Sequence, residues 1–362
     1  MASDSPGSGQ TGRRASSGPD NATDANGDGV AKRATSYDVA RLAGVTQPTV
    51  SRAMRGDRVA ESTRQRVLAA ASSLGYVPSR LGSSLATRRT DRVAMVIEDL
   101  QNPFYLGLLS AFERRLTDAG FNVVLLRHYG DDDALLEQLG AGGVDGVALT
   151  ALRWHSRLPQ ALQRRGIPSV LINRETESGG LDACVSDNAR GARLVADRLL
   201  KLGHRRIGMI AGRENTSTGR HRAAGFRDAL AEAGVAVHPA ACREVEYTHA
   251  DGHSALLELL DSPQAPTGLF CANDVLAIGA LNAAKKRGVR IPEDLSIIGY
   301  DDMTMSAWEC FDLTTVRQDI ETIASTAGEL LLDRIGGYTD GPRRVVVESR
   351  LMIRSTDGPP AS

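Results

Sequence analysis

Residues 35–54 read TSYDVARLAGVTQPTVSRAM and contain two short amphipathic stretches separated by Gly44 and Val45. Apolar residues recur at helical spacing through both stretches, and a longer helical pattern, STRQRVLAAASSLGY, follows at 62–76. We expect Val67, Leu68 and Leu74 of this third stretch to close a small core over the first two. The pattern therefore predicts a three-helix head at 34–76 whose first two helices form a helix-turn-helix.

The second stretch carries polar groups at its start and along one face. Ser36 is a candidate cap for the first helix, Thr46 for the second, and Pro48 suits an opening turn where no backbone donor is needed. The exposed polar side chains are then Gln47, Thr49, Ser51 and Arg52. Such a helix is typical of those that insert into the DNA major groove, where Gln can hydrogen-bond the edge of adenine and Arg the edge of guanine. Arginines better placed for phosphates are Arg55, Arg58, Arg64 and Arg66.

The charge distribution favours the same interpretation, although the formal net charge of −1 at first argues against a nucleic-acid binder. Residues 32–92 carry 12 basic and 4 acidic side chains, a net of +8, whereas residues 1–31 sum to −2 and residues 93–362 to −7. A basic block joined to an acidic body indicates that one part of the chain meets an anion. The alternative is a basic but purely solvated helical face.

Length and composition limit the class of protein. The chain has 362 residues, enough for two or three domains with full cores. No apolar run approaches a membrane span, and the start lacks a signal-peptide core, so we expect a soluble, cytoplasmic protein. Its 4 cysteines are scattered without a CxxC pair, which fits a reducing compartment and argues against zinc. Residues 1–33 have almost no apolar content and are expected to be a disordered tail.

From residue 92 onward, apolar runs of strand length alternate with helical patterns, which predicts parallel sheets covered on both faces. About 260 residues of this pattern indicate two similar lobes rather than one. No GxGxxG motif follows the first strand, which removes the main argument for a dinucleotide cofactor. Cys271 has no base placed beside it, and His249 and His253 have no nearby acidic partner. We therefore expect no enzyme activity, no cofactor and no metal site.

The head, with TRQRVLAAASSLGYVPSRLGSSLATRRT after it, resembles the DNA-binding head and hinge of the lac repressor/galactose repressor family of bacterial transcriptional regulators. The likeness continues through NPF, VSDNARGARL, LGHRRIGMIAG, RAAGFRDAL, FCANDVLAIGAL, RGVRIPEDLSIIGYDD and LTTVRQD, and it spans about 35–355. The resemblance implies an α plus α/β chain: a helix-turn-helix head, a hinge, and a two-lobed periplasmic-binding-protein-like core with parallel sheets. The expected parts are the tail 1–33, the head 34–76, the hinge 77–91, the first lobe 92–188 plus 318–338, and the second lobe 189–317 plus 339–356.

The resemblance also assigns the DNA contacts. Base contacts fall on Gln47, Pro48 and Arg52, and backbone contacts on Thr46, Thr49, Ser51 and Arg55. In the hinge, Leu85 takes the position of a minor-groove wedge and Arg80 flanks it. Ala60 stands where the family usually has a serine cap for the third helix. The implied partner is a double-stranded, pseudo-palindromic operator bound by a homodimer.

A small-molecule effector is expected between the lobes. The family pattern places its contacts at Asp99, Asn102, Phe104, Arg222, Tyr247, Asn273, Asp301 and Gln318. Planar Arg, Asp and Asn groups with two aromatic faces suit vicinal hydroxyls, so we favour a sugar. A purine is the weaker choice, because Thr216 stands where a second ligand-binding Arg is expected in that branch. The helix at 132–140 looks one turn shorter than is usual, which affects the first-lobe rim and part of the dimer contact.

The predicted function is a ligand-controlled transcriptional regulator that acts as a repressor. Two alternatives use the same two-lobed fold: a solute-binding protein and an enzyme. The basic head and the missing export signal argue against the first. The lack of a paired acid and base argues against the second.

Overall fold

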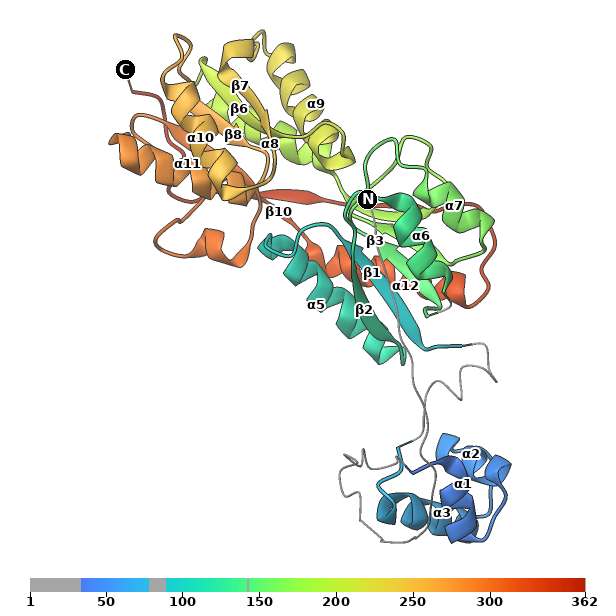
Figure 1. Ribbon diagram of the computed structural model, residues 1–362. Helices are drawn as coiled ribbons and strands as arrows, with labels where there is room; N and C mark the ends of the chain where they lie inside the picture. The colour runs from blue at the N-terminus through green and yellow to red at the C-terminus, as the bar shows by residue number, and fades with distance from the viewer. Residues whose placement is uncertain (1–33, 78–88, 142, 362) are drawn as a thin grey trace, which may run out of the picture. The chain divides into compact units, whose positions relative to one another are not determined.

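The computed structural model describes residues 34–77, 89–141 and 143–361. They fall into two compact units, one within residues 1–80 and the other within 81–362. The first unit is helical, and the second contains two six-stranded sheets with helices on both faces of each (Figure 1). The predicted fold class, a three-helix head followed by a two-lobed core with parallel sheets, is therefore confirmed.

The helical unit is a three-helix bundle with a small core. Its helices are α1 (Ser36–Ala43), α2 (Gln47–Arg55) and α3 (Glu61–Ser73). The buried residues of this core are Val39, Ala40, Ala43, Val50, Ala53, Val67, Ala70 and Ala71. The prediction that Leu68 and Leu74 close the core is wrong, since both are exposed. Small alanines one turn from Val67 fill the interface instead, and they let α3 approach the other two helices closely.

The helix ends of this unit follow the sequence with two differences. Thr35, not Ser36, caps α1 through a reciprocal pair of hydrogen bonds with Asp38. Thr46 is the N-cap residue of α2, but its hydroxyl lies 3.0 Å from the Thr49 hydroxyl and caps no backbone N–H. Ala60 precedes α3 without any side-chain cap, as its small apolar side chain predicts.

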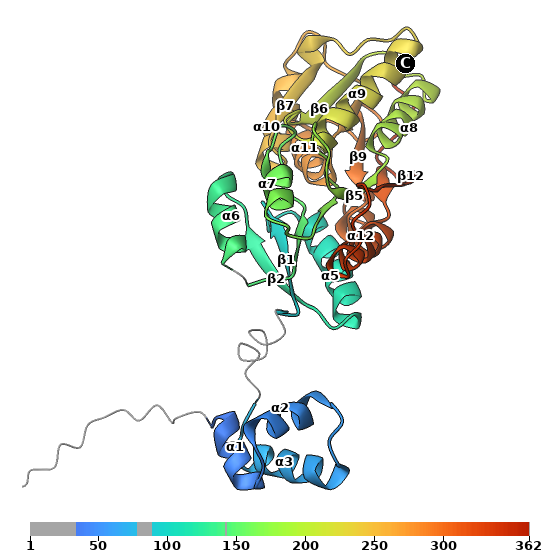
Figure 2. The same cartoon turned by 90° about the vertical axis from the view of Figure 1, so that its right-hand side faces the viewer.

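The first sheet of the core is entirely parallel and has the order β11-β5-β4-β3-β1-β2. Its strands are β1 (Arg92–Ile97), β2 (Asn122–Arg127), β3 (Gly146–Leu149), β4 (Ser169–Ile172), β5 (Asp182–Ser186) and β11 (Arg344–Val347). One face is covered by α5 (Pro103–Asp118) and α12 (Ile320–Ile335), and the other by α6 (Asp132–Gly140) and α7 (Leu158–Arg164). Figure 2 shows α6 and α5 on opposite sides of β1 and β2.

The second sheet has the order β12-β10-β9-β8-β6-β7, and only the β10–β12 pair is antiparallel. Its strands are β6 (Ile207–Gly212), β7 (Cys242–Val245), β8 (Gly268–Cys271), β9 (Ser296–Asp301), β10 (Thr315–Gln318) and β12 (Ser349–Met352). Its two faces are covered by α8 (Asn188–Lys201) with α9 (Ser217–Glu232), and by α10 (His249–Leu260) with α11 (Asp274–Arg287).

The chain passes between the two sheets three times, after β5, after β10 and between β11 and β12. The predicted boundary near the C-terminus needs a correction here. Residues 339–356 were expected in the second lobe, but β11 pairs in parallel with β5 of the first sheet. The strand is four residues long and alternates between exposed and half-buried positions, which left only a weak local signal.

Within the described ranges, no helix combines the length and the apolar character that crossing a bilayer requires. The helix α6 spans nine residues and begins at Asp131, whose carboxylate accepts hydrogen bonds from the N–H groups of Asp133 and Ala134. The acidic run at 131–133 therefore forms a helix N-terminus, where the helix dipole stabilises negative charge.

Candidate functional site

The outward face of α2 carries the polar residues that the sequence singled out. Val50 and Ala53 are buried against α1 and α3, which turns the opposite side of the helix to solvent. Pro48, Arg52 and Arg55 lie at i, i+4 and i+7 and are exposed, so they form one stripe along the helix. The half-buried residues beside this stripe are Gln47, Thr49 and Ser51.

The side chains of this face differ in how firmly they are held. The Gln47 amide lies 3.5 Å from the Ser36 hydroxyl, so α1 positions it at the start of α2. Arg55 lies 3.3 Å from the carboxylate of Asp57. The guanidinium of Arg52 has no hydrogen bond or ion pair to another described residue and projects from an ordered helix.

Further arginines surround this face. Arg58, Arg64 and Arg66 are all exposed. Arg58 lies in the connection between α2 and α3, and the other two lie on α3. A helix with a free guanidinium and flanking cations suits a polyanion whose groups are read at a groove. The predicted hinge residues Arg80 and Leu85 lie outside the described residues.

A cleft lies between the two lobes of the core, at the carboxyl ends of the parallel strands. Its outer part encloses about 190 Å³, which is less than the roughly 300–1,000 Å³ of sites for drug-sized ligands and suits a small ligand. Its outer part is lined by Glu98, Asp99, Asn102, Tyr105, Arg153 and Arg174 of the first lobe and by Arg213, Asn215, Thr216, Glu246, Tyr247 and Thr248 of the second. Its inner part is lined by Asn102, Phe104, Tyr105, Asn173, Arg174, Thr218, Arg222, Tyr247, Asn273 and Asp301.

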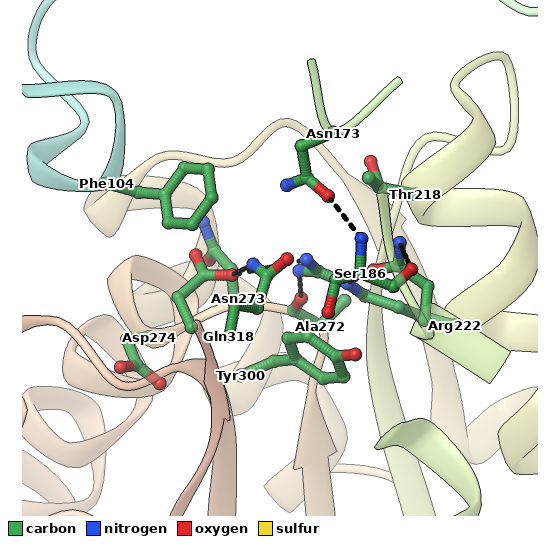
Figure 3. A network of polar contacts seen from close by, with 12 residues as sticks. Phe104, Asn173, Ser186, Thr218, Arg222, Ala272, Asn273, Asp274, Tyr300 and Gln318 are labelled. Carbon is green, nitrogen blue, oxygen red and sulfur yellow. Dashed lines mark hydrogen bonds and ion pairs between the residues drawn. The ribbon is translucent and has the colours of Figure 1, made fainter. Parts of the chain in front are cut away.

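Arg222 is the centre of the inner part. Its guanidinium donates to the Asn188 side-chain oxygen at 2.8 Å and to the Ala272 carbonyl at 2.6 Å, and it lies 3.2 Å from the carboxylate of Asp301. The guanidinium also stacks over the Tyr300 ring, 3.7 Å from the ring centroid. These contacts fix a buried cation in one orientation at the base of the cleft (Figure 3).

Asp301 and Asp274 are two buried carboxylates of the same region. Burial raises the pKa of Asp301, and the Arg222 guanidinium opposes that rise. Burial and the nearby Asp301 raise the pKa of Asp274 to about 7, although Ser306, Thr315 and the Met303 N–H donate to it. Asp274 therefore anchors the segments around it, whereas Asp301 presents its carboxylate to the cleft.

The first lobe supplies an aromatic wall and two polar groups near β1. Phe104 is buried and its ring faces the inner part of the cleft (Figure 3). Asn102 caps α5 by accepting from the Phe104 N–H at 3.1 Å, and Asp99 accepts from the Gln101 N–H at 2.8 Å. The remaining amide and carboxylate atoms of Asn102 and Asp99 face the cleft.

Tyr247 lines the second-lobe side of the cleft. Its ring lies against Gly212, where an added Cβ would come within 2.0 Å of the ring carbon Cζ. A side chain at position 212 would therefore displace the Tyr247 ring from this place in the cleft. Burial raises the pKa of the Tyr247 hydroxyl, so it remains a neutral donor at ordinary pH.

Seven of the eight predicted effector contacts line this cleft, and Gln318 is the exception. Gln318 instead donates to the Asp301 carboxylate at 2.6 Å and is a positioning residue for it. The seven lining residues are Asp99, Asn102, Phe104, Arg222, Tyr247, Asn273 and Asp301. Their roles in binding stay predictions.

Asn173 and Arg174, which follow β4 and line the inner part, were not among the predicted contacts. They stand at the carboxyl end of a parallel strand, where ligands of such sheets usually bind, so this rule could have found them. Asn173 and Asp301 both have positive φ, 51° and 123°. Such strained backbone concentrates at ligand sites, where surrounding structure maintains it.

Contacts at the rim join the two lobes. The Trp154 N–H of the first lobe donates to the Asn215 carbonyl of the second at 2.6 Å. The Trp154 ring meets the His221 ring edge-on at 5.7 Å, with the Arg220 guanidinium 5.3 Å from its centroid. We call Trp154, Arg220 and His221 the rim clasp. It depends on the lobes being close together.

Cys271 and His249, considered above as catalytic or metal-binding candidates, make contacts that a structural role explains. Cys271 is fully buried, and burial raises the pKa of its thiol, which disfavours the reactive thiolate. His249 contacts the Asn282 amide at 2.7 Å. In the described part of the chain, no group of three or more His, Cys, Asp or Glu side chains is arranged to hold a metal ion.

Comparisons with family models match both units. A model described as bacterial regulatory proteins, lacI family, matches residues 35–79, and one described as a periplasmic binding protein-like domain matches residues 196–356.

Curated relatives match over nearly the whole length. The HTH-type transcriptional regulator CelR of Thermobifida fusca is 37% identical over 338 residues, covering 90% of this chain and 98% of the relative. The HTH-type transcriptional repressor PurR of Yersinia enterocolitica is 33% identical over 334 residues, with the same two coverages.

Two solved structures have similar folds. A transcriptional regulator CelR–cellobiose complex is 35% identical, with a TM-score of 0.69 and coverage of 90% of this chain and 100% of that one. The lac repressor dimer bound to operator and the anti-inducer ONPF is 27% identical, with a TM-score of 0.81 and coverage of 90% and 99%.

Proposed function

Since this chain belongs to the lacI family of bacterial regulatory proteins and is a DNA-binding transcriptional regulator, we propose that a sugar bound between its core lobes controls its hold on operator DNA. The protein acts as a homodimer on a pseudo-palindromic operator, and its action there is repression. The lac repressor dimer on its operator is the precedent for this assembly. Its place of action is the cytoplasm, where the DNA lies.

The DNA sequence is recognised by α2. Arg52 is exposed and unpaired among the described residues, and Gln47 is held at the start of the helix by Ser36. We assign Arg52 to a guanine edge and Gln47 to an adenine edge. Pro48 lies between them and adds only apolar contact, since it has no side-chain donor. Thr46, Thr49, Ser51 and Arg55 take the neighbouring phosphates.

The hinge supplies the second DNA contact. Leu85 wedges between base steps at the operator centre, and Arg80 neutralises phosphates beside it. An inserted apolar side chain unstacks the bases at a cost of a few kcal/mol per step, which flanking cations offset. The assignment rests on the resemblance of residues 77–91 to family hinges.

The effector assignment rests on the inner cleft. The single observation that carries it is the buried Arg222–Asp301 ion pair, which lines the inner part of the cleft together with Phe104 and Tyr247. Hydrogen bonds to Asn188 and to the Ala272 carbonyl hold the guanidinium in place. Fixed, planar donors and acceptors beside apolar ring faces match the alternation of hydroxyl edges and C–H faces on a sugar ring. The cellobiose complex of CelR is a precedent in a relative that is 35% identical.

A purine effector fits less well. Thr216 stands at the cleft where the purine branch is expected to have an arginine, and its hydroxyl is used locally. It donates to the Arg213 carbonyl and accepts from the Gly219 N–H, which caps α9. A side chain engaged in this way offers no cation to a nucleobase.

A mobility-shift assay with the protein's own promoter tests the regulator and its effector together. We expect retardation at low salt that weakens steeply as salt rises, because phosphate contacts release counterions. Cellobiose and monosaccharides at millimolar concentration should change the retarded fraction, whereas hypoxanthine and guanine should not. No retardation by any promoter fragment at low salt would overturn the DNA-binding role of this head.

Control variants separate the two sites. Arg190 is an exposed arginine of α8 in the core, paired with Glu348. Arg190→Ala changes the net charge as Arg52→Ala does, but it should leave both retardation and the sugar response intact. A sugar response that survives loss of Arg222 would contradict the cleft assignment.

A further inference from the structure

Two arginines are buried in the described part of the core, Arg174 and Arg222, and only one of them has a counter-ion. Arg222 lies 3.2 Å from the Asp301 carboxylate. Arg174 is 6% exposed and has no Asp or Glu oxygen within 4.0 Å in residues 34–77, 89–141 and 143–361. A buried guanidinium without a carboxylate beside it recovers only part of its lost hydration energy from neutral hydrogen-bond partners.

The hydrogen bonds of Arg174 also leave it incompletely satisfied. One terminal nitrogen donates to the Asn173 carbonyl at 2.9 Å, and the other donates to the Tyr105 hydroxyl at 2.6 Å. The Nε atom is buried without a partner. Arginine has five N–H donors, so most of its donor capacity remains available. Both partners are neutral oxygens, which hold the side chain in place without balancing its charge.

The position of Arg174 connects this capacity to the cleft. It lines both the inner and the outer part, next to Asn102 and Tyr105. Its backbone follows Asn173, whose positive φ of 51° turns the chain sharply after β4. The guanidinium is therefore held at the junction of the two parts by the fold rather than by a flexible loop.

The acidic residues of the cleft either bond to other protein groups or are exposed to solvent. Asp301 is bound by Arg222 and Gln318, and Glu246 is paired with Arg213. Asp99 accepts from the Gln101 N–H, and Glu98 is exposed to solvent at the mouth. Asp301 acts on Arg174 only from beyond ion-pair distance, and its carboxylate is already bound by Arg222. An anionic group of a ligand would therefore supply the close counter-charge that Arg174 lacks among the described residues.

We propose that Arg174 binds an oxyanion of the effector, so that the preferred ligand is an acidic sugar, one that carries a carboxylate or a phosphate. This inference rests on the sugar effector proposed above and narrows its chemical class. The sugar ring lies in the inner part beside Arg222, and its acidic group reaches the guanidinium, which binds such groups through parallel N–H···O bonds. The exposed Arg153 of the outer wall adds a second, solvated cation.

Isothermal titration of the full-length protein with matched ligands tests the proposal. The neutral ligands are D-glucose and cellobiose, and the acidic ones are D-glucuronate, D-gluconate and glucose 6-phosphate. We expect at least one acidic ligand to bind tenfold or more tightly than the neutral ligands. Glucose 6-phosphate against the two carboxylates distinguishes a phosphate from a carboxylate.

Three variants assign the effect to Arg174. Arg174→Gln should abolish the preference for the acidic ligand, and Arg174→Lys should retain part of it. Arg190→Gln removes an exposed arginine outside the cleft and should change affinity less than threefold. Thermal unfolding without ligand checks folding, and Arg174→Gln should melt no lower than wild type, because it removes an uncompensated buried charge. If Arg174→Gln does not fold, the wild-type preference and the Lys variant decide the question.

The outcomes separate this proposal from the one it rests on. Neutral sugars that bind as tightly as acidic ones, or an acidic preference that survives in Arg174→Gln, would overturn the role of Arg174 and leave the sugar effector standing. Absence of binding by every neutral and acidic sugar, with DNA retardation intact, would overturn the sugar effector and this inference together.

Discussion

The Arg222–Asp301 pair allows a quantitative test of the core of the cleft. Both groups are almost fully buried, and Arg222→Leu leaves the Asp301 carboxylate without its counter-ion. Removing one partner of a buried ion pair costs about 3–5 kcal/mol of unfolding free energy. Asp301→Asn should cost less, because the guanidinium keeps its bonds to Asn188 and to the Ala272 carbonyl. The double variant has no buried charge at this point and should lose about 2–3 kcal/mol less than the sum of the single variants.

The measurement is urea unfolding of the full chain followed by tryptophan fluorescence. The chain has 2 tryptophans, Trp154 and Trp308, and both belong to the core, so the signal reports core unfolding. The pH adds a second readout, since Asp301 without Arg222 has a pKa raised further above its unfolded value. The penalty is then present above the folded-state pKa and disappears as the pH falls through it. Free energies that add within about 0.5 kcal/mol, or a Leu variant equally destabilised at pH 5 and pH 8, would refute the reasoning.

Three further outcomes are expected. Arg52→Ala should lose about 1–3 kcal/mol of discrimination at one operator base pair, measured by competition between the operator and its single-base variants. Arg190→Ala should lose none, and equal weakening of Arg52→Ala on all sequences would make Arg52 a phosphate contact. Trp154→Ala removes the rim clasp and should weaken effector binding by about 1–2 kcal/mol in titration calorimetry, whereas the control Trp308→Ala should bind like wild type. Equal affinities of Trp154→Ala and wild type would show that the clasp does not stabilise the bound form. Because the raised pKa of Asp274, about 7, makes its ionisation unfavourable in the fold, the melting temperature of wild type should fall more between pH 5 and pH 8 than that of Asp274→Asn; parallel pH profiles would contradict this.

The sequence predicted the head well, because local rules decide it. Helical spacing places Val39, Val50 and Val67 in one core, and Gly44 marks the turn with its positive φ of 63°. The failure at Leu68 has a physical reason. Packing of three short helices selects the small alanines 70 and 71 for close contact, and hydrophobicity alone cannot show this.

The sequence also located the carboxyl ends of several core strands, where parallel sheets place ligands. Asp99 and Asp301 lie in the cleft for this reason. The residues after β4 obey the same rule, but no charge pattern distinguished Arg174 from the many surface arginines. Arg174 differs from them because it is buried, and the residues that bury it, such as Tyr105, are distant in sequence.

By itself, then, the sequence determined the order of helices and strands, the basic head with its polar helix, and the residues that end each strand, since these depend on local spacing and charge. The tertiary structure alone decided that β11 joins the first sheet, that Trp154 meets His221 across the lobes, and that Arg222 has a counter-ion whereas Arg174 does not. These features depend on which distant segments the two sheets bring together, and on how much water that packing removes from each charge.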